Sequence, residues 1–315
     1  MNKCKIIMYH YVRSLKNSAY PEIKGLEETK FKNQLEYFKK KFEFGNFIDI
    51  IDSAYIKNEV KKNEVKKNEV ILTFDDGLKD HYTTVYPILK KMGIKGYFFP
   101  PSKPIEEKMV LDVHKIHFIL ASTQNKNQII KEIFRFINKN KNSIGNKTPQ
   151  EYFKELSIPN RFDTKEVIFI KRILQRELPL ELRNEITTNL FKKFVTKDES
   201  KFSEKLYMSL EEMKEMSESG MIFGSHSHSH EWLSHIDNKK LINEVENSKK
   251  FCHKISSKNN EIIMCYPYGD YNEQVINEIS KRGFKAGLTT NVGDAEIIKE
   301  KIFELSRYDT NDFPQ

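Results

Sequence analysis

Short apolar runs alternate with longer amphipathic stretches along the 315-residue chain, and this alternation constrains its fold more than any other feature. A strand, a helix and a further strand form the unit from which parallel sheets are built. The alternation therefore predicts an α/β fold with a parallel sheet. The predicted strands span residues 5–12, 70–74, 95–99, 222–225, 262–266, 285–290 and 302–306. The predicted helices span residues 29–41, 83–92, 209–219, 238–254 and 272–282.

Residues 102–206 differ from the rest of the chain, because strand signals are absent and helical patterns dominate there. This predicts one domain over residues 1–315 with a helical insertion over residues 102–206. Within it, His114 and His117 have the spacing of one helical face. They are interpreted either as residues facing the active site or as one surface and one packed histidine, and the second interpretation is favoured.

Two further local patterns mark boundaries. Ser209 and Glu212 have the spacing of a capping box, which predicts the start of a helix. Residues 57–70 read KNEVKKNEVKKNEV, a five-residue repeat that fits neither a helix nor a strand. We interpret this repeat as a solvated loop that leads into the next strand.

Composition and charge exclude several classes of protein. The formal net charge is +8, with 53 basic and 45 acidic residues. The basic residues are mostly Lys spread along helices, without an Arg-rich patch interleaved with aromatics, so no nucleic-acid partner is predicted. No stretch approaches 18 apolar residues, so no transmembrane segment is predicted. The three cysteines are odd in number and show no CxxC spacing, which indicates a reducing compartment. The N-terminus shows no signal-peptide pattern. We therefore expect a cytoplasmic protein.

The first chemically informative stretch is ILTFDDG, residues 71–77. An apolar strand ends there in two adjacent aspartates, Asp75 and Asp76, followed by a glycine. Carboxylates at the carboxyl end of a parallel strand lie where α/β folds place their active sites. Asp-Asp-Gly is also ordinary turn chemistry, so a second cluster is needed to favour a site.

The second cluster is GSHSHSHEWLSH, residues 224–235, which holds four of the nine histidines. An extended chain would point His226, His228 and His230 to one face, whereas a helical turn would bring together only His226 and His230. The flanking sequence favours the turn. Two imidazoles and one carboxylate are then predicted to hold a catalytic Zn²⁺ with one position left for water. Of two adjacent aspartates, one can bind the metal while the other takes a proton.

TFDDG (residues 73–77) followed by HSHSH (residues 226–230) resembles the polysaccharide deacetylase, or NodB-homology, family of carbohydrate esterases. The likeness extends to MYHYV, CYPYGDYN and ELSRYDTND at the two ends of the chain. The resemblance implies an irregular (β/α) barrel with the site at the carboxyl ends of the strands. It also implies that Asp75 is the general base and that Asp76, His226 and His230 bind the metal. Ser227 would steady the loop, and His228 would point away from the metal.

The chain departs from the family pattern in two places. The arginine that precedes Pro-Tyr-Gly in the family is absent, although the Tyr268 backbone N–H would still serve the oxyanion. Arg307 is a candidate to brace Asp75, with a structural salt bridge as the alternative. The late Leu-x-His motif is also absent, because no histidine follows His253. His10 is the candidate general acid, and a buried structural histidine is its alternative.

The resemblance implies a hydrolase that uses a divalent metal, with Zn²⁺ favoured and Co²⁺ or Ni²⁺ also accepted by such ligands. Its substrate would be an N-acetylated carbohydrate, and a lipid-linked or nucleotide-linked glycan precursor fits the expected cytoplasmic location. Two other functions stay open at this point. One is a hydrolase of a non-sugar amide that uses the same metal site, and the other is a non-catalytic glycan-binding protein.

Overall fold

The computed structural model describes residues 3–16, 18–55, 68–144, 147–159, 163–256 and 261–315. Most of the five-residue repeat predicted as a loop lies outside these residues. The chain divides into two units, each described by itself. Unit 1 comprises Met1–Ser14, Gly25–Lys108 and Ser203–Gln315, and unit 2 comprises Leu15–Lys24 and Met109–Phe202. The insertion predicted over residues 102–206 stays a prediction, and Leu15–Lys24 adds to unit 2 a segment that was not predicted with it.

Unit 1 contains the strands. They are β1 (Lys3–Tyr9), β2 (Glu43–Phe44), β3 (Glu69–Asp75), β4 (Gly96–Phe99), β5 (Ile222–Phe223), β6 (Ile263–Cys265), β7 (Ala286–Leu288), β8 (Ala295–Glu296) and β9 (Tyr308–Asp309). Its α-helices are α1 (Glu28–Lys41), α2 (Phe47–Tyr55), α3 (Tyr86–Met92), α4 (Lys103–Glu106), α12 (Leu210–Glu218), α13 (Asn238–Ile255) and α14 (Glu273–Lys281), and the second half of α11 (Glu199–Leu206) also lies in it. Short π- or 3₁₀-helical segments are His81–Val85, Leu233–His235, Pro267–Gly269, Lys299–Lys301 and Thr310–Asp312.

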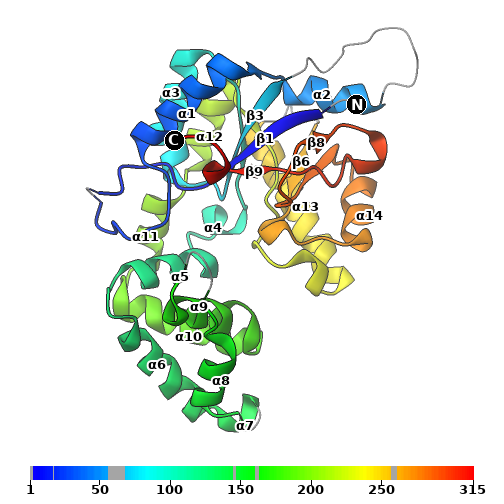
Figure 1. Ribbon diagram of the computed structural model, residues 1–315. Helices are drawn as coiled ribbons and strands as arrows, with labels where there is room; N and C mark the ends of the chain where they lie inside the picture. Colours follow the sequence, from blue (N-terminus) through cyan, green and yellow to red (C-terminus); the bar gives the residue numbers. More distant parts are fainter. Residues whose placement is uncertain (1–2, 17, 56–67, 145–146, 160–162, 257–260) are drawn as a thin grey trace. The chain divides into compact units, whose positions relative to one another are not determined.

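The strands of unit 1 follow one another around an irregular barrel. The larger sheet has the order β5-β4-β3-β1-β8, with β2 on β3 and β9 on β1, and β6 pairs with β7. All these pairs are parallel except β1 with β8. A single parallel bridge from Ser225 to Met264 joins β5 to β6, and another from Leu288 to Leu305 joins β7 to the segment before β9. β1 pairs with both β3 and β9 (Figure 1), and the two sheets are joined by isolated bridges rather than by a continuous closed ladder.

The α/β prediction is confirmed, and most predicted strands and helices lie within a few residues of the observed ones. The strand predicted over residues 302–306 is wrong. The segment is a turn in which only Leu305 makes a bridge, because Ile302 and Leu305 are buried at a spacing of three rather than two. The sequence also failed to predict β2, β8 and β9, since two-residue strands are too short to show a periodicity.

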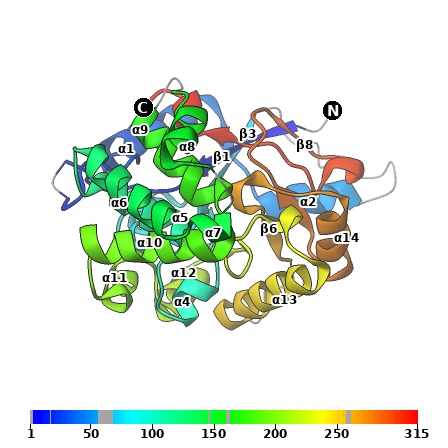
Figure 2. The ribbon, with the colours of Figure 1, turned by 90° about the horizontal axis from the view of Figure 1, so that it is seen from below.

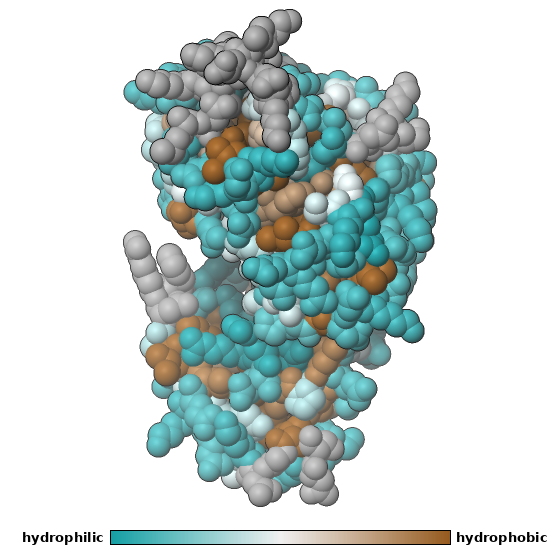
Figure 3. All heavy atoms as spheres, turned by 90° about the vertical axis from the view of Figure 1, so that its right-hand side faces the viewer, coloured by the Kyte–Doolittle hydropathy of each residue, from teal (hydrophilic) through white to brown (hydrophobic). Residues whose placement is uncertain are grey.

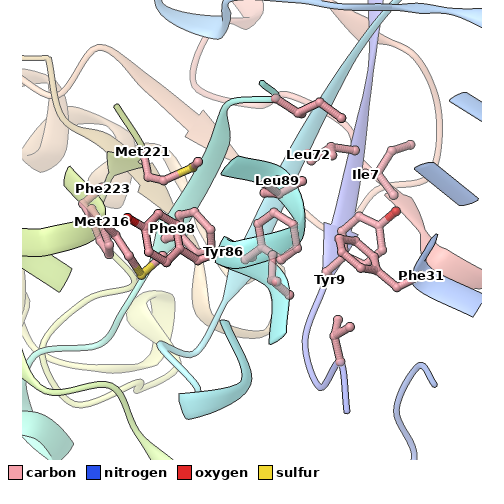
Figure 4. Close-up of a cluster of buried hydrophobic side chains, with 14 of the residues drawn as sticks. Ile7, Tyr9, Phe31, Leu72, Tyr86, Leu89, Phe98, Met216, Met221 and Phe223 are labelled. Atoms are coloured by element: carbon pink, nitrogen blue, oxygen red, sulfur yellow. The ribbon is translucent and has the colours of Figure 1, made fainter. Parts of the chain in front are cut away.

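One apolar cluster packs α2 against β1, β3 and β4. Helices also pack against strands in two further apolar layers. One packs α1, α3 and α12 against β1, β3 and β4, and Figure 4 shows Ile7, Tyr9, Phe31 and Phe98 among its buried side chains. Tyr9, Phe74 and Phe98 stack in a row, with ring centroids 5.0 and 4.8 Å apart. The other layer packs α13 and α14 against β6 (Figure 2). Packing of this kind fixes the strand ends, where polar residues emerge.

Unit 2 is helical. Its α-helices are α5 (Asp112–Ala121), α6 (Lys126–Lys139), α7 (Lys141–Ile144), α8 (Pro149–Leu156), α9 (Lys165–Arg172) and α10 (Leu180–Phe194), with a π-helical turn at Ile173–Glu177 and the first turn of α11. Thr148 and Glu151 form a capping box at the start of α8, and Ser209 and Glu212 form the predicted one at α12 in unit 1. Ile133, Phe169 and Phe191 are fully buried, so unit 2 has an apolar interior of its own.

Hydrophilic residues cover most of the face seen in Figure 3, with hydrophobic residues in separate patches. The large hydrophobic side chains that are exposed include Ile158 and Val292. None of the helices in the described ranges is long and apolar enough to cross a membrane.

Candidate active site

Polar side chains from separate segments of unit 1 meet where parallel strands end. Asp75 is the last residue of β3, His10 follows β1 and His226 follows β5. Arg307 lies directly before β9, which pairs with the last part of β1. The carboxyl ends of parallel strands open on the same side of a barrel. The fold therefore brings together residues that lie up to 297 positions apart in the sequence, from His10 to Arg307.

Asp75 is held by a buried arginine. Arg307 donates from Nη1 to Asp75 Oδ1 at 2.9 Å, and its Nη2 lies 2.8 Å from Oδ2. The arginine is in turn fixed because Nε donates to the Thr289 carbonyl at 2.8 Å and Nη1 donates to Thr73 Oγ1 at 3.2 Å. Burial alone would raise the pKa of Asp75, but Arg307, with His226 and His10 nearby, outweighs it and lowers the pKa to about 2. Asp75 is thus ionised at neutral pH.

Asp76 lies between two histidines. Its Oδ1 is 3.4 Å from His226 Nε2 and 3.5 Å from His230 Nε2. All three side chains are buried, and their ligand atoms lie within 4.8 Å of one another. Two imidazole nitrogens and a carboxylate oxygen on one small centre are the donor set of a catalytic zinc site with an open position. The residues therefore fit a divalent metal. His226 Nδ1 contacts the Cys265 carbonyl at 2.8 Å, which orients the ring.

The stretch from His226 to His230 is a bend and not the predicted helical turn. Ser227 and His230 have φ values of 61° and 60°, a left-handed conformation that an α-helix of L-residues excludes. The bend still brings His226 and His230 together and turns His228 away from them. His226 and His230 face each other with ring centroids 4.8 Å apart, whereas His228 Nδ1 contacts Ser102 Oγ at 2.7 Å. The Ser227 hydroxyl accepts a hydrogen bond from the His230 N–H at 3.0 Å.

The DDG turn is also left-handed. Asp76 has φ 74° and Gly77 has φ 63°. A Cβ added at Gly77 would lie 2.7 Å from Pro100 Cβ, so this position needs a glycine for space as well as for its backbone. Strained backbone of this kind clusters at functional sites, and here it turns the Asp76 carboxylate toward the histidines.

His10 lies beside both aspartates. Its Nε2 is 3.9 Å from Asp75 Oδ2 and 4.0 Å from Asp76 Oδ2, and 42% of its side chain is exposed. It is therefore not the buried structural histidine of the alternative interpretation. Its backbone carbonyl contacts Nε2 of the buried His81 at 2.9 Å. Burial lowers the pKa of His81 to about 4, so that ring stays neutral.

Tyr268 completes the rim of the site. It is left-handed, with φ 59°, and its ring meets that of His230 at a centroid distance of 4.6 Å. The ring of Trp232 stacks on it at 4.3 Å. This aromatic pair was not predicted from the sequence, because residues 232 and 268 are brought together only by the tertiary structure.

Several residues that contact the site were not singled out from the sequence. Thr73 had a usable signal, because it lies two residues before Asp75 and strand periodicity puts both on one face. Thr289 had none. His114 and His117 belong to unit 2, where His114 is buried and their ring centroids lie 5.9 Å apart.

A family model and several known proteins match this chain. The model of the polysaccharide deacetylase family matches residues 62–192 and 184–287. A stretch of 91 residues is 33% identical to YxkH of Bacillus subtilis, a protein named for polysaccharide deacetylation; it covers 29% of this chain and 32% of that protein. The chain thus matches about a third of the length of this curated relative.

Two solved structures are similar in fold. The deacetylase PplD of Streptococcus pyogenes, solved with acetate, has a TM-score of 0.58 and 18% identity, over 98% of this chain and 92% of that one. A de-N-acetylase of Aggregatibacter actinomycetemcomitans has a TM-score of 0.52 and 15% identity, over 98% and 95% of the two chains. Both likenesses establish the fold of this chain.

Proposed function

Because the chain belongs to the polysaccharide deacetylase family, we propose that it is a metal-dependent hydrolase that removes the N-acetyl group from an N-acetylated sugar in a glycan or glycan precursor. The observation that carries the proposal is the pair of adjacent aspartates with different surroundings. Asp76 lies between His226 and His230, and Asp75 is bound by Arg307. One carboxylate would thus bind metal and the other would take a proton.

Asp76, His226 and His230 would hold the metal, with Zn²⁺ favoured and Co²⁺ or Ni²⁺ also suited to this donor set. When bound, such an ion polarises a carbonyl and makes water more acidic. His226 presents Nε2 to the site because its Nδ1 contacts the Cys265 carbonyl. That contact fixes the ring orientation, as the outer partners of histidine ligands generally do.

Asp75 would be the general base. It is ionised at neutral pH, and each carboxylate oxygen keeps lone-pair capacity beyond its contact with Arg307. Arg307 would orient the Asp75 carboxylate, which is the bracing role expected for it from the sequence. A water deprotonated by Asp75 would attack the acetamide carbonyl carbon of the sugar.

Tyr268 would stabilise the oxyanion that forms on the carbonyl oxygen, through its backbone N–H. The left-handed backbone at Tyr268 and its stacked partner Trp232 set the direction of this group. His10 would then protonate the leaving amine, since it is partly exposed and lies within 4.0 Å of both aspartates. Acetate and a free amino sugar are the products.

We further propose that the substrate is a lipid-linked or nucleotide-linked glycan precursor. A hydrolase of a non-sugar amide would use the same residues. A non-catalytic glycan-binding protein is disfavoured by the braced Asp75, because binding alone does not require an oriented base.

The proposal is tested by measuring acetate release from oligomeric, lipid-linked and nucleotide-linked N-acetyl sugars, with Zn²⁺ supplied. His230→Ala should lose both metal and acetate release. His228→Ala is the matched control, because His228 contacts Ser102 and not Asp76, and it should keep both. Activity confined to amides without a sugar would overturn the sugar assignment, and loss of metal in the His228 variant alone would overturn the ligand assignment.

A further inference from the structure

The bend that carries the two histidine ligands is attached to α13 by one buried carboxylate. Glu244 lies on the buried face of α13 and is 4% exposed. Its Oε2 accepts hydrogen bonds from the His228 N–H at 3.0 Å and from the Ser229 N–H at 2.8 Å. Its Oε1 accepts one from the Ser229 hydroxyl at 2.5 Å. A single side chain thus satisfies two backbone amides between His226 and His230.

The bend needs such support because part of its backbone has an unfavourable conformation. Ser227 and His230 are both left-handed, a conformation that non-glycine residues adopt only when their surroundings enforce it. The His228 and Ser229 amides lie between these two residues. Without an acceptor they would be left unsatisfied next to a buried site, which is costly.

The opposite side of the bend is also fixed, but by weaker means. The Ser102 N–H donates to the Ser227 carbonyl at 3.3 Å, and the Lys103 N–H donates to the His228 carbonyl at 2.9 Å. These bonds hold carbonyl groups of the bend. Glu244 is the charged partner of its amide groups, and hydrogen bonds to a charged acceptor are about twice as strong as neutral ones.

We propose that Glu244 is a positioning residue for metal binding, which holds the bend so that His226 and His230 present both Nε2 atoms to Asp76. The proposal rests on the function proposed above. Glu244 acts through the backbone between the metal ligands, at His228 and Ser229. Its role is to keep the two nitrogens at one centre before a metal arrives.

The test compares three variants. Glu244→Ala removes the acceptor for both amides. Glu244→Gln keeps it, because the amide oxygen can take the place of Oε2 while the NH₂ group donates to Ser229, whose hydroxyl can reverse. Glu246→Ala is the matched control, since Glu246 lies on the same helix and pairs with Arg282 at 3.2 Å, away from the bend.

Metal affinity of the metal-free protein is measured by competition of Zn²⁺ with a chromogenic chelator, and the visible spectrum of the Co²⁺-loaded protein reports ligand geometry. Glu244→Ala should weaken Zn²⁺ binding by about 10- to 100-fold, as loss of an outer partner of a metal ligand generally does. It should also alter the Co²⁺ spectrum. Glu244→Gln should fall between the wild type and Glu244→Ala, because its hydrogen bonds are retained but lose their charge, and Glu246→Ala should be unchanged.

Wild-type affinity and spectrum in a folded Glu244→Ala protein would overturn the proposal, and so would a Glu244→Gln variant as impaired as Glu244→Ala. If circular dichroism shows that Glu244→Ala does not fold, Glu244→Asp, whose carboxylate is one methylene shorter, is judged by the same criteria. A wild-type protein that binds no metal would instead refute the proposed function, so the two failures are distinguishable.

Discussion

The two units bury very different side chains. In the described part of unit 2 the buried polar residues are His114, Lys115 and Thr187, and Lys115 is paired with Glu199 at 3.0 Å. Unit 1 buries a connected group of charged and polar side chains at its strand ends, which includes Asp75, Asp76, His226, His230, Glu244 and Arg307. Burying charge costs free energy unless it is paired. The buried charged groups of the site therefore lower the stability of unit 1, whereas unit 2 has the mostly apolar interior that is usual for a folded domain.

The largest expected effect separates the two aspartates of unit 1. Asp75→Asn should lower acetate release by about 10²- to 10⁴-fold, the usual loss for a missing general base, and keep its metal. Asp76→Asn should lose metal, because it removes a ligand from between His226 and His230. Mass spectrometry of bound metal and an acetate assay measure the two effects. Equal metal loss in both variants would show that the division of roles is wrong.

The next effect concerns the buried pair of Asp75 and Arg307. Arg307→Met should lower the free energy of unfolding by about 3–5 kcal/mol, because it leaves a buried carboxylate without its partner. Adding Asp75→Asn to this variant should recover part of the loss, since no buried charge then remains. Denaturant unfolding of the single and double variants measures this. A double variant less stable than Arg307→Met would mean that the pair is not the source of the cost.

Truncation of a core side chain in unit 2 should lower the stability of the protein and leave metal binding unchanged. Ile133 is fully buried in α6, and Ile133→Ala should lower the free energy of unfolding by about 2–5 kcal/mol through the cavity it leaves. Calorimetry measures the loss, and Zn²⁺ affinity should match the wild type. A change in metal affinity at a temperature where the variant is folded would contradict the contrast between the units.

The smallest expected effect is a pH-dependent one in unit 2. Asp163 contacts Lys24 at 2.5 Å and Lys171 at 2.7 Å. Partial burial would raise the pKa of Asp163, but its hydrogen bonds to Lys171 and Lys24 outweigh burial and lower it. A lowered pKa stabilises the fold above the unfolded pKa, about 3.9, and this contribution is lost as the pH falls through the folded value.

Asp163→Asn should therefore cost no more than about 1 kcal/mol at pH 7, because these pairs are partly exposed. The difference from the wild type should shrink as the pH falls below 4. Thermal unfolding across this pH range measures the stability difference. A difference that grows on acidification would contradict a lowered pKa of Asp163 in the folded protein.

The sequence by itself determined the local features. Hydrophobic periodicity located the longer strands and helices, and turn and cap chemistry located their ends at Ser209 and Asp75. The two motifs, residues 73–77 and 226–230, identified Asp76, His226 and His230 as candidate ligands, because closely spaced residues of metal-binding types can be recognised in the sequence. Glu244 could also have been noticed, since it is the charged residue at the mostly apolar buried positions of α13.

Only the tertiary structure decided which distant residues meet. The contact of Arg307 with Asp75 joins the last strand to the third, and the stacking of Trp232 on Tyr268 joins two loops. Neither contact can be predicted from spacing along the chain, because both depend on how the strands and loops of unit 1 are arranged in space. The bend at His226–His230 was also beyond the sequence pattern. Its left-handed residues are held by Glu244 and Ser102 across space, and hydrogen bonds of this kind override the helical preference of the local sequence.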